Sequence, residues 1–337
     1  MNEYTGKVIT SRGSVNPSTL GRVMMHEHLH LDFAQKNEIP FDMRKWDVLE
    51  KQAVPALKKI KKFGCRTIVD MSFPPHRAEA WVYKKISEMA GFNLVLATGF
   101  YREIELEKYW IHLPEDQIWP FVRSASQEEL EEFCLREIEE GIHASGIKPG
   151  VLKIASSAME LTDTEKKAIK AVASVQKKTG LLINTHANTP GAFKSQLDLI
   201  ESEGVDPKRV CLGHTQVQLV QEWADVRECM KRGALFSLDW IGEDQAEKVK
   251  QAFEEGLGGQ MALARDSGFK IGYTEYYANP KWRPRQGDSV NLTWFSEGVP
   301  FTHFFKDTLL RYMEVGITEQ MLNKMLVENP QRILPVK

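Results

Sequence analysis

Three of the nine histidines fall within five residues, in the segment His26-Glu27-His28-Leu29-His30. On an extended backbone, side chains two residues apart face the same way, so His26 and His28 are expected to point together from one strand end. Two neutral imidazoles on one face form a half-site for a divalent transition metal. Such pairs also occur in cores and on surfaces, and His30 is expected beyond the strand, in a supporting or structural role.

Two further histidines each end a short apolar run. They are His186, in Asn184-Thr185-His186, and His214, in Leu212-Gly213-His214. Neighbouring strands of a sheet lie ~4.8 Å apart, so these two imidazoles could bind a second metal together. Either one alone is typical of a buried core histidine, but the pair opposite a His-x-His motif favours a metal site.

A lysine and an aspartate complete the candidate ligands. Lys153 lies in the apolar run Val151-Leu152-Lys153-Ile154, where it either extends to solvent on its long stem or is kept neutral by adjacent cations. A neutral amine adds carbon dioxide, and the resulting anionic carbamate can bridge two metals. Asp266 ends the last apolar run and offers a carboxylate to a metal or its water, although alone it is equally typical of a helix cap or a salt bridge.

These residues need elements that bring them together, and the sequence alternates short apolar runs with helical patterns. The runs are residues 22–25, 67–69, 94–97, 151–154, 181–184, 210–212, 235–237 and 261–264. Helical patterns between them include Gln127–Glu140 and residues 164–179, the latter followed by Gly180 as a C-cap. Eight such repeats predict an α/β fold, a (β/α)8 (TIM) barrel. An open doubly wound sheet is the alternative, but no Gly-rich phosphate loop follows the first run.

The ends of the runs provide a test of the barrel, because barrels place functional residues at the carboxyl ends of their strands. The residues at these ends are His26 and His28, Asp70, Gly99-Phe100-Tyr101, Lys153, His186, His214, Asp239 and Asp266. Histidines and carboxylates are thus concentrated where a barrel enzyme needs them. We expect one domain over residues 1–337, with residues 1–20 as an extension leading into the first strand.

Composition excludes several other classes of protein. The net charge of −2, from 44 basic and 46 acidic residues, argues against a nucleic-acid surface or a polybasic membrane patch. No apolar run approaches the ~18 residues of a membrane span, and the first residues lack a signal-peptide pattern, so we expect a cytoplasmic protein. The four cysteines form no CxxC pair and no dinucleotide fingerprint is present, which disfavours a disulfide framework and a redox enzyme.

Taken in order, these residues resemble the phosphotriesterase family of the amidohydrolase superfamily. The matching segments are Gly6-Lys7-Val8-Ile9-Thr10, Leu20-Gly21-Arg22, Met25-His26-Glu27-His28-Leu29 and the ending Val327-Glu328-Asn329-Pro330-Gln331-Arg332. The order of metal-ligand residues along the chain is similar too, and the resemblance covers essentially the whole chain.

The resemblance implies a centre with two divalent metal ions, zinc being favoured over manganese, cobalt or iron. It places His26, His28 and Asp266 on the more buried ion and His186 and His214 on the more exposed one. Carbon dioxide would be held as a carbamate on Lys153, bridging the ions. Glu275 is a rival for the acid, but Asp266 follows a turn ending Gly256-Leu257-Gly258-Gly259, as the acid of the family does.

Members of the family hydrolyse lactones, phosphotriesters, and some carboxylic esters or N-acyl amides. Here Trp240 follows Leu238-Asp239, where phosphotriesterases carry a histidine, and no acid soon follows His214. Conversely, Thr98-Gly99-Phe100-Tyr101 resembles the lactonases, in which a tyrosine reaches the metal site; a rim aromatic is the alternative. We therefore expect lactone or carboxylic-ester hydrolysis, with Asp266 and Tyr101 as catalytic residues. Phosphotriester or N-acyl amide hydrolysis is the alternative, and a non-catalytic metal-binding barrel is a remote one.

The stretch after Asp266, residues 269–286, is rich in cations and hydrogen-bonding aromatics. As a loop over the metals it would suit an anionic small molecule, such as a carboxylated or phosphorylated lactone. The expected substrate contacts are Tyr101, Trp240, Lys270, Tyr273 and Arg283. A solvated loop or a contact in a homodimer is the alternative for this stretch.

Overall fold

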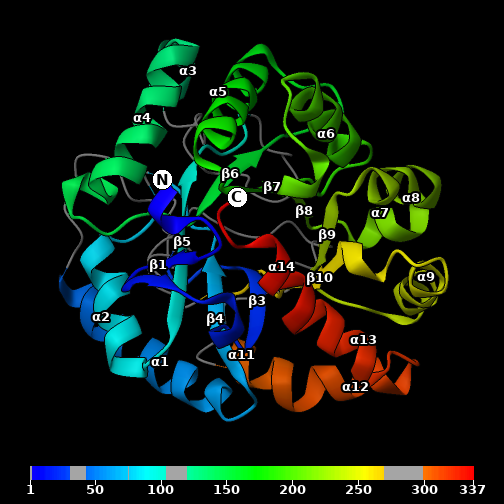
Figure 1. Cartoon of the computed structure of the whole chain (residues 1–337). Coiled ribbons are helices and arrows are strands. Elements are labelled where there is room, and N and C mark those ends of the chain that lie inside the picture. Colours follow the sequence, from blue (N-terminus) through cyan, green and yellow to red (C-terminus); the bar gives the residue numbers. More distant parts are fainter. Residues whose placement is uncertain (1, 31–42, 75, 104–119, 269–298) are drawn as a thin grey trace, which may run out of the picture.

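The computed structural model describes residues 2–30, 43–74, 76–103, 120–268 and 299–337. Eight parallel strands pair in chain order, and helices surround them (Figure 1). The strands are β3 (Arg22–Glu27), β4 (Cys65–Asp70), β5 (Asn93–Gly99), β6 (Val151–Ala155), β7 (Leu182–His186), β8 (Val210–Gly213), β9 (Leu235–Leu238) and β10 (Met261–Leu263). Backbone hydrogen bonds from Asp266 to His26 (3.0 Å) and from His28 to Ser267 (2.8 Å) join the chain after β10 to the end of β3. The predicted (β/α)8 barrel is confirmed.

The helices pack on the outside of the barrel. They are α1 (Met43–Lys61), α2 (Ala80–Ala90), α3 (Pro120–Ser124), α4 (Gln127–Glu140), α5 (Asp163–Thr179), α6 (Ala192–Ser202), α7 (Gln216–Gln221), α8 (Trp223–Arg232), α9 (Glu243–Glu254), α11 (Val299–His303), α12 (Leu309–Glu314), α13 (Glu319–Asn323) and α14 (Asn329–Ile333). The predicted bounds of α4 are confirmed, and α5 begins one residue earlier than predicted. Both start with a capping box, in which Ser126 and Thr162 accept hydrogen bonds from the third helical residue.

Along each strand, side chains alternate between two apolar cores. In β6, Leu152 and Ile154 belong to the core between the sheet and the helices, whereas Val151 belongs to the core inside the barrel. Because both faces are buried, the strand reads as a continuous apolar run rather than an alternating one. The same alternation turns Lys153 toward the interior, on the side of Val151.

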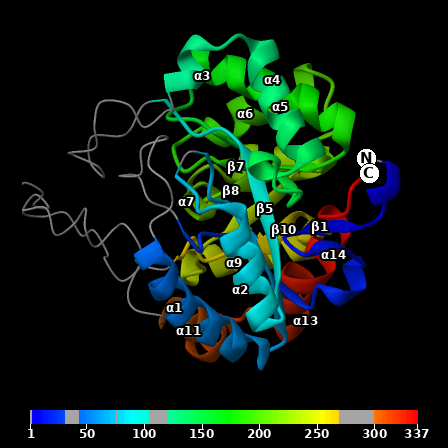
Figure 2. The ribbon, with the colours of Figure 1, turned by 90° about the vertical axis from the view of Figure 1, so that its left-hand side faces the viewer.

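The amino end of the barrel is closed by the first residues and the last ones. A hairpin of β1 (Val8–Thr10) and β2 (Gly13–Val15) lies across this end, and Val8 and Leu20 extend the inner core together with Leu334. The backbone of Gly6 donates to Val336 (2.9 Å), so the first and last segments lie side by side (Figure 2). The sequence predicted only an extension here, because strands of three residues carry too little periodicity to recognise.

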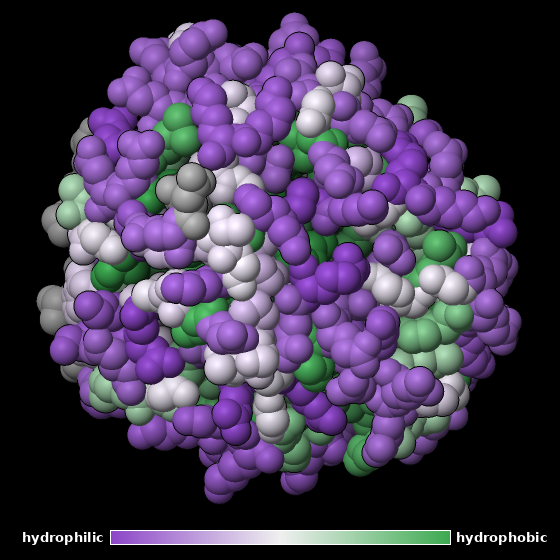
Figure 3. All heavy atoms as spheres, viewed as in Figure 1, coloured by the Kyte–Doolittle hydropathy of each residue, from purple (hydrophilic) through white to green (hydrophobic). Residues whose placement is uncertain are grey.

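The outer face of this end is largely hydrophilic. Figure 3, which views the same face as Figure 1, shows apolar residues there only as small separate patches. No helix in the described ranges is long and apolar enough to cross a membrane.

Candidate metal centre

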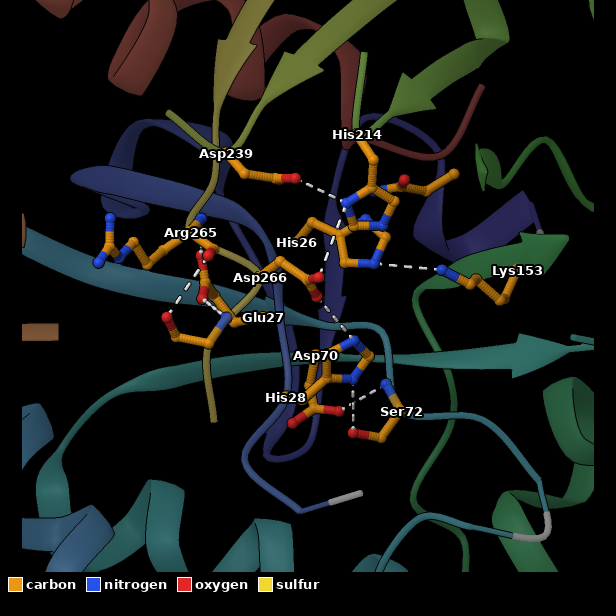
Figure 4. Close-up of polar contacts among 12 residues, drawn as sticks. His26, Glu27, His28, Asp70, Ser72, Lys153, His214, Asp239, Arg265 and Asp266 are labelled. Atoms are coloured by element: carbon orange, nitrogen blue, oxygen red, sulfur yellow. Dashed lines mark hydrogen bonds and ion pairs between the residues drawn. The ribbon is translucent and has the colours of Figure 1, made fainter. Parts of the chain in front are cut away.

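His26 and His28 lie at the carboxyl end of β3, where its pairing with β4 is irregular. The register shifts between Met24 and Glu27, and such bulges re-aim side chains next to active sites. His26 is fully buried and His28 is 7% exposed, with their ring centroids 5.5 Å apart. Both imidazoles lie in the mouth of the barrel (Figure 4).

His186 is the last residue of β7, and His214 follows directly after β8, the strand that pairs with β7. The ring centroid of His214 lies 4.3 Å from that of His186 and 4.3 Å from that of His26. Since Cys211 faces the inner core, regular alternation would turn His214 outward. Instead His214 has a left-handed backbone (φ +63°), which is costly for a non-glycine residue and is typical of functional sites.

The residue before His214 must be a glycine. A Cβ on Gly213 would lie 2.4 Å from the carbonyl oxygen of Thr185 and 3.1 Å from Nδ1 of His26. Only the absence of a side chain therefore lets β8 approach β7 while the His26 ring fills the space in front of it.

Lys153 is 1% exposed, so the alternative in which it extends to solvent is wrong. Its Nζ atom lies 3.1 Å from Nε2 of His26 (Figure 4). Burial lowers the pKa of Lys153 to about 7, because desolvation penalises the ammonium form more than the nearby carboxylates favour it. A substantial fraction of this amine is thus neutral near pH 7, as addition of carbon dioxide requires.

Asp266 lies just after β10 and faces two of the histidines. One carboxylate oxygen is 3.2 Å from Nε2 of His28, and the other is 3.8 Å from Nδ1 of His214. Burial alone would raise the pKa of Asp266, but the charges of His214 and His28 outweigh it and hold that pKa below its usual range. The carboxylate is therefore ionised at neutral pH. Its backbone, like that of His214, is left-handed (φ +49°).

The donor set fits metal ions. Two sets bring one potential ligand atom each to within 4.8 Å of one another: His26, His28 and Asp266, and His214, Asp239 and Asp266. His186 belongs to neither set, although its ring lies beside that of His214. Buried atoms with no hydrogen-bond partner in the described part of the chain include His26 Nδ1, His186 Nε2, His214 Nε2 and Asp239 Oδ1. Leaving such atoms unsatisfied costs ~1–3 kcal/mol each, which a bound cation would offset.

The protonation states agree with this interpretation. Burial, followed by nearby cationic groups, lowers the pKa of His26 and of His186 well below the usual value. Both imidazoles are neutral at pH 7, and only the neutral ring can donate a lone pair to a metal.

Two carboxylates support the site in ways that the sequence did not reveal. Glu27 is fully buried and accepts hydrogen bonds from the backbone of Arg265 (2.6 Å) and Ser267 (2.9 Å), which fixes the two residues that flank Asp266. Asp239 accepts a hydrogen bond from Nδ1 of His214 at 2.7 Å and so orients that ring. The sequence held a signal for each role: Glu27 lies between His26 and His28, and Asp239 follows β9, the strand next to that of His214.

Tyr101 follows β5 and lies against the metal-ligand residues. Its ring stacks on that of Phe73, with centroids 4.3 Å apart and planes 9° apart. It also meets the ring of His186 edge-on, with centroids 5.5 Å apart. The ring of Tyr101 therefore lies beside the candidate ligand His186, and its stacking on Phe73 fixes its orientation.

Of the other predicted substrate contacts, the structure describes one, Trp240. Trp240 is half-buried after β9. Lys270, Tyr273 and Arg283, together with the rival acid Glu275, lie outside the described residues.

Comparison with known proteins identifies the family of the chain. A model of the phosphotriesterase family matches residues 6–334. The chain belongs to the phosphotriesterase family. Its relatives in this family include the phosphotriesterase homology protein of Mycobacterium tuberculosis, 28% identical over 96% of each chain. The N-acetyltaurine hydrolase of Xenopus tropicalis is 23% identical over the full length of both chains.

Solved structures of the phosphotriesterase family share the fold. One is an enzyme in which organophosphate hydrolysis was engineered from a weak promiscuous lactonase template. It is 26% identical with a TM-score of 0.77, over 97% of this chain and 99% of that one. The chain is thus a metal-dependent hydrolase of the phosphotriesterase family, with side chains suited to a binuclear centre.

Proposed function

We propose that this hydrolase cleaves a lactone or a carboxylic ester. The observation that carries the proposal is the placement of Tyr101 against His186. A planar carbonyl develops one oxyanion during attack, and a phenol beside the metal ligands is positioned to donate a hydrogen bond to it. A phosphotriester brings three bulky substituents, and we expect Trp240, which lies just after β9 at the carboxyl end of the barrel, to leave less room for them.

The metal ions would be held by His26, His28 and Asp266 on one side and by His186 and His214 on the other, with carbamylated Lys153 shared between them. When bound, two divalent ions lower the pKa of water toward neutrality and polarise the substrate carbonyl.

The chain's own residues supply the remaining steps. The ionised carboxylate of Asp266 orients the attacking water and accepts its proton, then returns it to the leaving oxygen. Asp239 keeps Nε2 of His214 facing the site by holding its Nδ1. In a lactone the leaving oxygen stays attached, so the product is a hydroxy acid.

N-acyl amide hydrolysis is the second candidate. It is favoured by the similarity to a relative named for N-acetyltaurine, which extends over both full chains. The same tyrosine and carboxylate would serve an amide carbonyl, so the ligand residues do not separate the two reactions.

The test is a comparison of kcat/KM for lactones, phosphotriesters and N-acyl amides, with protein loaded with zinc or manganese plus bicarbonate. We expect lactones to be preferred. A preference of ~100-fold for either other class, ~2.7 kcal/mol of transition-state stabilisation, would contradict the proposal.

Tyr101→Phe is the matched variant, because it retains the stacking on Phe73 and removes only the hydroxyl group. We expect kcat for a lactone to fall ~10–100-fold with KM little changed, as befits a donor used in the transition state. An unchanged kcat would leave Tyr101 as a rim aromatic.

A further inference from the structure

Arg102, the residue after Tyr101, is an arginine whose charge is buried at the carboxyl end of the barrel. It is only 3% exposed. Its guanidinium carbon lies 5.4 Å from the centre of the Tyr101 ring, and one terminal nitrogen donates a long hydrogen bond (3.4 Å) to Oδ1 of Asn188. Its Nε atom, like that of Arg209, has no partner among the described residues, so what distinguishes Arg102 is its terminal nitrogens, for which those residues provide no carboxylate and one long hydrogen bond.

Two other buried arginines show how this protein satisfies such a charge. Arg77, 5% exposed, forms an ion pair with Glu137. Arg209, 7% exposed, donates three hydrogen bonds to the backbone carbonyls of Gly180, Ile333 and Pro335. Arg102 has neither arrangement in the described ranges. A buried charge is costly without a partner, and no described residue offers Arg102 an anionic one, so its guanidinium is suited to an anion from outside the chain.

The position of Arg102 indicates where that anion comes from. Tyr101 contacts the ring of His186, and Asn188 comes two residues after His186. The guanidinium thus lies between the loops that follow β5 and β7, at the edge of the candidate metal centre. Its charge is close enough to contribute, after burial and His214, to the lowered pKa of His186.

We propose that Arg102 binds an oxyanion of the substrate, a carboxylate or a sulfonate, and so orients the scissile carbonyl beside the metal ligands. The planar guanidinium matches a carboxylate with two parallel hydrogen bonds, which gives direction as well as affinity. The inference rests on the proposed function and narrows it to anionic substrates. Asn188 accepts one long hydrogen bond from the guanidinium and, being neutral, leaves its charge uncompensated.

The test uses two substrates that differ in one charge: γ-butyrolactone-5-carboxylate and its neutral carboxamide. The measured quantity is the ratio of their kcat/KM values. We expect wild-type protein to prefer the carboxylate, and Arg102→Gln to lower the ratio by ~30-fold, since hydrogen bonds between charged groups are the strong ones. Arg102→Lys should restore part of the ratio. The control is Arg227→Gln, which removes a partly exposed arginine of α8 that is paired with Glu255. It should keep the wild-type ratio.

A second variant keeps Arg102 but pairs its charge with a carboxylate of the chain, so that it is no longer free to bind a substrate anion. Asn188→Asp places a carboxylate at the atom that now accepts the hydrogen bond from Arg102. We expect it to lower the ratio as Arg102→Gln does, whereas the neutral Asn188→Ser should not. This pair remains informative if Arg102→Gln fails to fold.

The outcomes separate this proposal from the proposed function. If neither lactone is opened, the lactone form of the proposed function fails, and the same variants are compared on an N-acetyl amino acid, its amide and N-acetyltaurine. A ratio that still depends on Arg102 there supports the anion site, and the taurine derivative tests a sulfonate. Wild-type protein with no preference for the charged substrate in either series, or variants that lower both members of a pair equally, would overturn the proposal.

Discussion

At the amino end of the barrel, Arg209 donates hydrogen bonds to the carbonyls of Gly180, Ile333 and Pro335. At the carboxyl end, His26 and His214 each keep a buried ring nitrogen that has no hydrogen-bond partner among residues that the structure describes. Arg209, His26 and His214 are all buried, so the contrast lies in how their polar atoms are satisfied. Polar groups that the chain satisfies stabilise the fold, whereas groups it leaves open are available to a ligand.

The backbone beside the candidate ligands is strained. His214 and Asp266 have left-handed conformations that cost roughly 1–3 kcal/mol each. His143 and Ala144, in the turn before β6, are left-handed too, so such strain is not confined to the carboxyl end. Paired backbone groups, such as the hydrogen bonds between the first and last segments, help to offset it.

The largest effect should come from Lys153→Ala. Removing the group that two metal ions would share is expected to abolish binuclear binding and lower kcat/KM by ~1,000-fold or more. Metal analysis and kinetics measure both, and propionate should partly restore activity by supplying bridging oxygens. Lys170→Ala, on the outside of α5, is the control. Two bound ions per chain in Lys153→Ala would exclude the bridging role.

A smaller effect, of a different kind, is expected from Arg209→Gln. Loss of three hydrogen bonds to buried or partly buried carbonyls should lower the free energy of unfolding by about 3 kcal/mol, which urea titration measures. The kcat/KM of the folded protein should stay within ~2-fold of wild type. A loss of activity comparable to that of Lys153→Ala would show that the two ends are not separable.

The smallest effect should come from Asp239→Asn. The asparagine still accepts a hydrogen bond from His214 but no longer supplies a negative charge, so metal affinity should fall ~10–100-fold. A metal titration measures this, and Asp206→Asn, at a short helical turn before β8, is the matched control. If the affinity of Asp239→Asn equals that of wild type, the negative charge of Asp239 does not contribute to metal binding.

Much of the fold was predictable because each strand of a parallel barrel is buried on both faces. The runs at residues 151–154 and 210–212 were recognisable from this property alone. The bounds of α4 followed from an amphipathic stripe between Ser126 and Gly141. The hairpin at the amino end was not predictable, because its pairing depends on contacts with β5 and the chain end rather than on local pattern.

The site was predictable in its residue types but not in its supporting contacts. The spacing of His26 and His28 and the position of Lys153 in the order of ligand residues along the chain are enough to predict a metal centre. Strict alternation along β8 would turn the side chain of His214 outward, but its left-handed backbone turns it into the site. The direction of this side chain is therefore known only from the folded structure. Likewise, the partners of Glu27 are more than two hundred residues away along the chain.

Those partners of Glu27 lie where the ring of strands closes. The contacts that join the chain after β10 to β3 are made by Asp266 and Ser267, and they adjoin the candidate metal ligands. The contacts that close the barrel therefore also bring the candidate ligands together. A cation bound there would stabilise the junction between β3 and the chain after β10. The slowest-exchanging amide hydrogens of the loaded protein should therefore include those of Asp266 and Ser267, and chelation should release them first.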